Sequence, residues 1–480
     1  MFKTSSAAAF LLSTALLGTA GAIPASAQPA AAAATANVPP IAFTERKLAN
    51  GLKVIAIRDT TTPNVMVSMW YEVGSKHDPE GRSGFAHLFE HILSRKTVNM
   101  PYNAINRMVD DIGGTRNAST WYDRTNYYEI VPAEYLERML WTHAERMARP
   151  VVDQEVFETE RNVVKEELRQ RVLAPPYGRL FSFAFGENMY SVLPHRRPTI
   201  GSIEDLDSAT LEDARAFHEA YYGPDTATLI VSGNFEPAQL TALVDRYFGL
   251  IKPRPRKTSL AITGKDRPLS SRNVVASAPN VPLPAAAAAF QIPGTNHRDL
   301  PALAVLDAIL ARANHNRLDT AQVKSGLATE VGSYFNDIED SGFLALYAFA
   351  AGGKQPDAVA VELQAAIDRL RQSGPTADEL SEAKNELLAG ALEERETFSG
   401  RAFELGEALV RTGDPKAADK RLAGIGLVTV ADVRRVAQTY LNPARRVNFT
   451  YTDGSGDPKQ WANPVPLPAF KSAPPPTGPA

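Results

Sequence analysis

The five residues His87-Leu88-Phe89-Glu90-His91 set two imidazoles and one carboxylate at helical spacing, in a chain of 480 residues with only 8 histidines. At about 100° per residue, His87 and His91 lie one turn apart on one helix face, and Glu90 lies beside that face. Two ring nitrogens can then hold one metal ion while the carboxylate addresses water next to it. The pattern predicts a zinc site with its own base. The alternative is a pair of surface histidines beside a glutamate.

A third ligand must come from another element, because a catalytic zinc usually takes three protein ligands. The chain has no cysteine, so the ligand must be His, Asp or Glu. A helix-like stretch over 157–167 offers Glu160 and Glu167, which share one face to within about 20°. Either could point at the metal. Glu166 projects about 100° away and is the weaker candidate.

The beginning of the chain predicts export. An apolar stretch over 7–22 precedes Ala25-Ser26-Ala27, a pattern typical of a secretory signal peptide that is cut after Ala27. We therefore expect a signal peptide over 1–27, a flexible Ala/Pro lead-in over 28–40, and a periplasmic or secreted protein with no membrane span. The formal net charge of -3 and the lack of a basic run with interleaved aromatic residues argue against nucleic-acid binding.

Strand-like and helix-like periods alternate along the chain, which predicts an α+β fold with two similar halves. We expect a catalytic zinc-binding domain over 41–251, a proline-rich linker over 252–284, a homologous non-catalytic domain over 285–463 and a Pro-rich tail over 464–480. The expected strands are 52–57, 65–73, 126–131, 226–232, 285–291 and 342–350, and the expected helices are 84–94, 132–149, 153–171, 300–312, 355–372 and 376–398. The stretch 300–312 stands where the histidine helix stands, and it has no His or Glu.

These residues resemble the insulinase or pitrilysin family of metallopeptidases, the zincins with an inverted H-x-x-E-H motif. In that family the third ligand is a glutamate in a stretch like E-R-x-V-x-x-E, and Glu167 follows His91 at the matching spacing of 76 residues. The stretch 113–127 is similar to the family's G-G-x-x-N-A-x-T-x-x-D-x-T-x-Y strand, and the resemblance extends roughly over 41–451. It implies two similar α/β-sandwich domains, like those of M16 peptidases and the metalloenzyme LuxS, that form half of a clamshell.

The resemblance also implies roles for single residues. His87, His91 and Glu167 would hold one Zn²⁺ per chain, and Glu90 would accept a proton from water and pass it to the leaving amine. Glu160 would orient a ligand. Asn117 and Ala118 would bind the peptide substrate as an added β-strand. The expected function is that of an exported zinc metalloendopeptidase. Manganese or cobalt could occupy the same kind of site.

One region departs from the family. Members that work alone carry an arginine and a tyrosine seven residues apart in the non-catalytic domain, and the matching positions here are Gln322 and Thr329. Neither replaces the charge of a guanidinium or the reach of a phenol. We therefore expect a homologous partner subunit that lacks H-x-x-E-H, with a homodimer as the alternative. A peptidase-like scaffold with an idle site is the alternative function. His143, His195 and His218 are expected in surface or capping positions.

Overall fold

The computed structural model describes residues 38–254, 265–339 and 341–455, and these residues belong to one compact unit. The predicted signal peptide, most of the lead-in and the Pro-rich tail lie outside the described residues. Within the described ranges, none of the helices combines the length and the apolar character needed to cross a bilayer.

The first sheet has six strands in the order β1-β2-β6-β3-β5-β4. β2 and β6 run parallel, and the other neighbours run antiparallel. Strand β3 is buried almost along its whole length, as expected for a central strand that is covered on both faces. The bounds are β1 Thr44–Lys47, β2 Lys53–Arg58, β3 Asn64–Tyr71, β4 Thr115–Thr120, β5 Thr125–Pro132 and β6 Ala227–Gly233.

The second sheet repeats five of these six strands in the order β7-β11-β8-β10-β9. Its parallel pair, β7 with β11, matches β2 with β6, and its edge strand β9 matches β4. The predicted α+β fold with two similar halves is confirmed. The bounds are β7 Arg272–Ala278, β8 Ala285–Pro293, β9 Ala328–Asp337, β10 Ser341–Ala350 and β11 Val447–Asp453.

Helices surround both sheets, and the helices predicted from the sequence are found near their expected bounds. The helices of the first half are α1 Phe85–Leu93, α2 Ala104–Asp110, α3 Leu136–Ala148, α4 Gln154–Leu168, α5 Phe185–Met189, α6 Leu193–Arg196, α7 Ile203–Ser208, α8 Leu211–Tyr221 and α9 Pro237–Phe248. Those of the second half are α10 Leu300–Asp307, α11 Pro356–Ser373, α12 Ala377–Glu396, α13 Phe398–Thr412, α14 Ala417–Leu427 and α15 Val430–Tyr440. Turns of π-helix follow α4 and α10, at Arg169–Leu173 and Ala308–Arg312.

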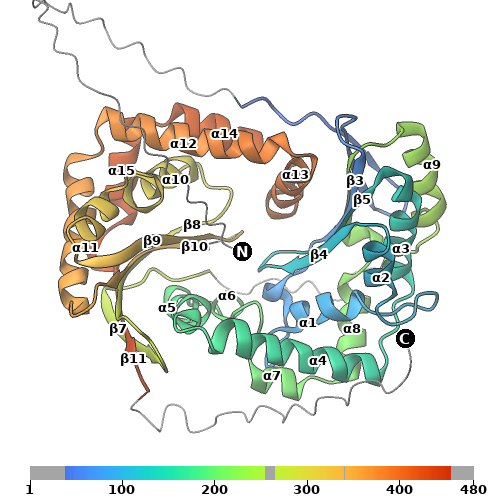
Figure 1. The fold of residues 1–480 in the computed structure, drawn as a ribbon, viewed down its shortest axis with the longest axis horizontal. Coiled ribbons are helices and arrows are strands. Elements are labelled where there is room, and N and C mark those ends of the chain that lie inside the picture. The colour runs from blue at the N-terminus through green and yellow to red at the C-terminus, as the bar shows by residue number, and fades with distance from the viewer. Residues whose placement is uncertain (1–37, 255–264, 340, 456–480) are drawn as a thin grey trace, which may run out of the picture. The chain divides into compact units, whose positions relative to one another are not determined.

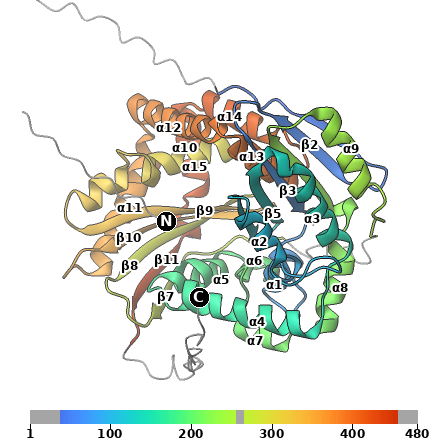
Figure 2. The ribbon, with the colours of Figure 1, turned by 45° about the vertical axis from the view of Figure 1, so that its right-hand side comes forward.

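The two halves exchange helices across their sheets. One face of the first sheet packs on helices of its own half, but its other face receives Ala402, Leu405 and Leu409 of α13, which belongs to the second half (Figure 1). In return, Phe185 and Met189 of α5 pack against strands of the second sheet (Figure 2). Both sheets are therefore middle layers of α/β/α sandwiches, and each sandwich needs the other half of the chain.

The proline-rich region predicted as a linker over 252–284 contains a strand. Residues Arg272–Ala278 form β7, which pairs with β11 in parallel register. The prolines at 268, 279 and 282 flank this segment without entering it. β7 is an edge strand whose first half is largely exposed, so it lacks the regular apolar alternation that marks a half-buried strand. Only its distant partner β11 makes it a strand.

Candidate metal centre

Helix α1 carries the histidine motif, and the residue just before it, the N-cap Gly84, is fixed by close contacts. Gly84 has φ 89°, and a Cβ there would lie 2.6 Å from the carbonyl oxygen of Ile200, so glycine is required. Glycine offers no side-chain cap. Asp78 takes that role, because its carboxylate accepts the N–H groups of Gly84 and Ala86, both at 2.8 Å. The helix then buries its apolar face, which holds Phe85, Ala86, Leu88, Phe89, Ile92 and Leu93.

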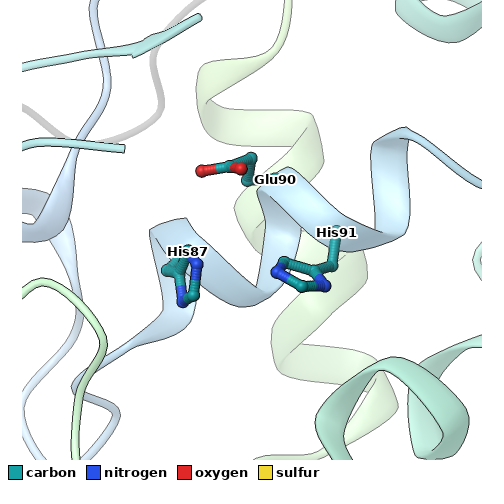
Figure 3. A group of neighbouring side chains, drawn as sticks. All are labelled: His87, Glu90 and His91. Carbon is teal, nitrogen blue, oxygen red and sulfur yellow. The ribbon is translucent and has the colours of Figure 1, made fainter. Parts of the chain in front are cut away.

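The opposite side of α1 carries the two histidines. Their rings lie side by side with centroids 4.9 Å apart, and Figure 3 shows both rings on one side of the helix with Glu90 on the adjacent side. One possible ligand atom from each of His87, Glu90 and His91 lies within 4.8 Å of the others. The motif thus forms the helical cluster that its spacing predicts.

Helix α4 lies beside α1 (Figures 1 and 2) and brings Glu167 to the histidines. Its Oε2 is 3.3 Å from Nε2 of His91 and 3.7 Å from Nε2 of His87. These distances exceed the usual length of an N–H···O hydrogen bond, about 2.7–3.2 Å. They match the separation of about 3.4 Å between neighbouring ligand atoms in a tetrahedral zinc site with bonds of about 2.0–2.1 Å. His87, His91 and Glu167 could therefore hold a zinc ion.

The two other glutamates of α4 differ in their contacts. Glu160 is fully buried; its Oε2 is 3.4 Å from Nδ1 of His91 and 2.9 Å from Nε of Arg95, and its Oε1 accepts the Tyr102 hydroxyl at 2.5 Å. Burial opposes its charge, but the nearby ring of His91 and the hydrogen bond from Tyr102 lower the pKa of Glu160. Glu166 instead contacts Arg169 and Gln170.

Glu90 is placed to act as a base. It is 9% exposed, and its Oε2 accepts the hydroxyl hydrogen of Thr120, at the end of β4, at 2.5 Å. Burial raises the pKa of Glu90 above its ordinary value, and the hydrogen bond from Thr120 lowers it in part. Thr120 stands in the stretch 113–120 that the sequence singled out, but nothing in its residue type or spacing indicated this contact.

The two histidines differ in charge. Burial lowers the pKa of His87 to about 4, so at neutral pH it offers a neutral ring nitrogen. Burial also opposes the charge of His91, but the nearby carboxylates of Glu160 and Glu167 raise its pKa to about 9. A metal ion must displace that proton, so metal affinity should rise with pH.

A pocket of about 680 Å³ opens over this cluster. Asn117 and Ala118 of β4 line it together with the predicted ligands. β4 is the last strand of its sheet, and the N–H of Ala118 bonds to the side chain of Asn117 at 2.9 Å instead of to another strand. The free edge of β4 therefore faces the pocket.

The second half contributes Tyr334, of β9, to the wall of this pocket. Gln322 and Thr329, the positions that match the family's arginine and tyrosine, are not among the lining residues. Gln322 is fully buried, and its amide atoms have no hydrogen-bond partner within the described ranges. The seven-residue spacing of the family's arginine and tyrosine pointed to positions 322 and 329, and it did not predict that Tyr334 lines the pocket.

The expectation that His143, His195 and His218 occupy surface or capping positions is wrong. All three are buried. His143 Nε2 is 2.6 Å from Glu129, and His195 Nδ1 is 2.7 Å from Asp266. His218 stacks on Phe89. The partners lie 14, 71 and 129 residues away in the chain, so no local pattern reveals them.

Comparisons with known proteins agree with this fold. Residues 53–185 match the family model described as Insulinase (Peptidase family M16), and residues 208–387 match the Peptidase M16 inactive domain. The zinc protease PqqE of Helicobacter pylori is 29% identical over 399 residues, which cover 82% of this chain and 89% of that protein.

Solved structures share the fold. The crystal structure of a protease from Helicobacter pylori aligns with a TM-score of 0.81 and 27% identity, over 86% of this chain and 100% of the other. The first half of the periplasmic protease PqqL from Escherichia coli aligns with a TM-score of 0.69 and 18% identity, over 87% and 94% of the two chains.

The paired sheets and the cluster of two histidines and a glutamate define a peptidase-family protein. The chain belongs to the insulinase family, peptidase family M16.

Proposed function

We propose that this protein is an exported zinc-dependent metalloendopeptidase that hydrolyses peptide bonds in peptides or unfolded polypeptides. The observation that carries the proposal is the convergence of His87, His91 and Glu167 at the separation of zinc ligands, with Glu90 left beside them. The zinc protease name of the Helicobacter pylori relative supports it.

A bound zinc ion supplies Lewis acidity, which acidifies water and polarises a carbonyl group. The chain's own residues supply the rest. Glu90 accepts the proton of the attacking water at its carboxylate and delivers it to the amine that leaves. Thr120 fixes the orientation of that carboxylate through its hydroxyl. Glu160 holds the ring of His91 through Nδ1, as carboxylates behind metal-binding histidines do.

The free edge of β4 is the proposed binding site for the substrate backbone. An extended peptide can add to this edge as a further strand, with Asn117 and Ala118 at its centre. The Asn117 side chain must then release the N–H of Ala118, which becomes available to the substrate. Such a site binds the backbone of an extended segment. A folded substrate rarely offers an unpaired extended segment, so the site favours unfolded substrates.

We also propose a partner and a location. Because neither Gln322 nor Thr329 lines the pocket, a homologous subunit without H-x-x-E-H would complete the site, or a second copy of this chain would do so. The processing-peptidase-like subfamily of two-domain chains fits this arrangement. Cleavage after Ala27 would deliver the mature chain to the periplasm or the medium, and the periplasmic PqqL relative supports export.

A second candidate is a peptidase-like scaffold with an idle site. It is favoured by the match of residues 208–387 to a domain described as inactive, and by the absence of an arginine at position 322.

Cleavage of a quenched-fluorescent peptide library by the purified mature chain, loaded with zinc, separates the two functions. The peptidase should cleave peptides in a chelator-sensitive way, and Glu90→Gln should lower kcat by about 10²–10⁴-fold while still binding zinc. Glu166→Gln, on the same helix α4 but outside the cluster, is the matched control and should keep native kcat. If the zinc-loaded, folded protein cleaves no peptide, either alone or mixed with a candidate partner subunit, the peptidase function is refuted and the scaffold function remains.

A further inference from the structure

The pocket over the metal cluster has a cationic end. Arg95, which follows α1, and Arg116, on β4, both line it. Among the residues that the structure describes, Glu90 and Glu167 are the carboxylates in the pocket wall, and both have tasks in the proposed site. Among the described residues, this end of the pocket therefore presents cations without a matching anion in the wall.

The positive charge of Arg116 is not fully neutralised by the carboxylates around it. The nearest carboxylate is the fully buried Glu129, 3.8 Å from Nε of Arg116. Glu129 already has closer partners, because Arg146 lies at 2.8 Å and His143 at 2.6 Å. These partners and Arg116 hold the pKa of Glu129 well below its usual range, although burial opposes this. One carboxylate thus faces two guanidinium groups.

The guanidinium of Arg116 also has free donors. One of its amino nitrogens donates to Asn106, and its Nε has no hydrogen-bond partner within the described ranges. Its side chain is only 15% exposed. An arginine has five N–H donors in a planar fork that suits a carboxylate, and a largely desolvated cation gains most from an anion. Arg95, by contrast, is balanced by Glu160 at 2.9 Å.

The position of Arg116 sets where a substrate could reach it. Arg116, Ala118 and Thr120 alternate along β4 and therefore share one face of the sheet, the face on which Thr120 meets Glu90. A peptide added to this edge advances about 6.6 Å for every two residues. The residue that passes Arg116 is then about two to four positions from the bond held at Glu90.

We propose that Arg116, with Arg95 beside it, forms a subsite for a carboxylate that the substrate carries about two to four residues from the cleaved bond. This inference rests on the proposed function, because it places the substrate along β4. An aspartate or glutamate side chain supplies such a carboxylate within a longer peptide. A free C-terminus supplies the same group when the peptide ends there.

Binding to the zinc-loaded Glu90→Gln variant tests the subsite without turnover. Fluorescence anisotropy would compare labelled, C-terminally amidated peptides that carry Glu or Gln at each position around one central bond. At one or two positions, the Glu peptide should bind about 10-fold or more tightly than the Gln peptide, and the difference should shrink at high salt. A Gln peptide with a free C-terminus at that position shows whether a terminal carboxylate serves equally well.

Arg116→Gln in the same background should abolish the difference between the Glu and Gln peptides. This variant should fold, because Arg146 and His143 still pair with Glu129. Arg116→Lys keeps the positive charge but loses the planar guanidinium that can bind both carboxylate oxygens. This variant should therefore keep only part of the affinity difference between the Glu and Gln peptides. Equal affinities in the starting protein, a difference that survives Arg116→Gln, or no binding of either peptide would overturn the subsite. The cleavage assay with the native chain tests the peptidase separately.

Discussion

At the scale of single residues, Thr120 should control the acid limb of the pH profile through Glu90. A base works only when it is ionised, so activity is lost as pH falls through the pKa of Glu90. Burial raises that pKa above its ordinary value of 4.5, and the Thr120 hydrogen bond opposes the shift. Thr120→Val removes a donor to the ionised form. The acid limb of kcat/KM should therefore move to higher pH.

The control for this prediction is Ser119→Ala, the preceding residue on β4, whose hydroxyl bonds to Asn126 and not to Glu90. Its acid limb should stay at the native position. Profiles of kcat/KM between pH 4 and 8, at saturating zinc, give the comparison, with this range of about four units chosen to bracket the ordinary pKa of a glutamate. An unchanged limb in Thr120→Val would show that Thr120 does not stabilise the ionised form.

Glu160 should tune the affinity for zinc without holding the ion. Its Oε2 lies 3.4 Å from Nδ1 of His91, so Glu160→Gln weakens the partner that orients this ring. Such changes typically cost about 10–100-fold in metal affinity. Competition with a chromophoric chelator measures the change, and one zinc per chain should still bind at saturation. Glu166→Gln, which changes a carboxylate bonded to Gln170, should leave the affinity as it is.

At the scale of an element, Asp78 should decide how firmly α1 is anchored. Asp78→Ala leaves the N–H groups of Gly84 and Ala86 without their acceptor. Two unpaired buried donors cost about 2–4 kcal/mol in the free energy of unfolding. The Tm of the variant, measured with chelator present, should fall clearly. Asp78→Asn keeps one acceptor oxygen, so its Tm should fall less than that of Asp78→Ala. A native Tm for Asp78→Ala would mean that α1 needs no such cap.

At the scale of the whole molecule, α13 should link the stability of the two halves. Gly406 of α13 faces the indole of Trp70, and a Cβ there would overlap the ring. Gly406→Ala should therefore push α13 from the first sheet and cost about 1–3 kcal/mol. Gly390→Ala, on α12 with no atom within 4 Å of the added Cβ, is the control and should be neutral or slightly stabilising. Differential scanning calorimetry compares them, and equal Tm values would refute the prediction.

The sequence by itself determined the features that depend on neighbours along the chain. The spacing of His87, Glu90 and His91 defines one helix face whatever surrounds it, and the spacing of Glu160 and Glu167 restricts the third ligand to one side of α4. Apolar periodicity likewise predicted most strands and helices of both halves, because an element that buries one face must repeat its apolar residues with its own period.

The tertiary structure alone decided what depends on residues far apart in the chain. The choice between Glu160 and Glu167 at Nε2 of the histidines follows from how α4 lies against α1. The strand β7, the cap by Asp78, the exchange of α13 and α5, and the place of Tyr334 in the pocket wall all follow from contacts between distant segments. The sequence carries no period or spacing for such contacts, because they arise only when packing selects one arrangement of the elements.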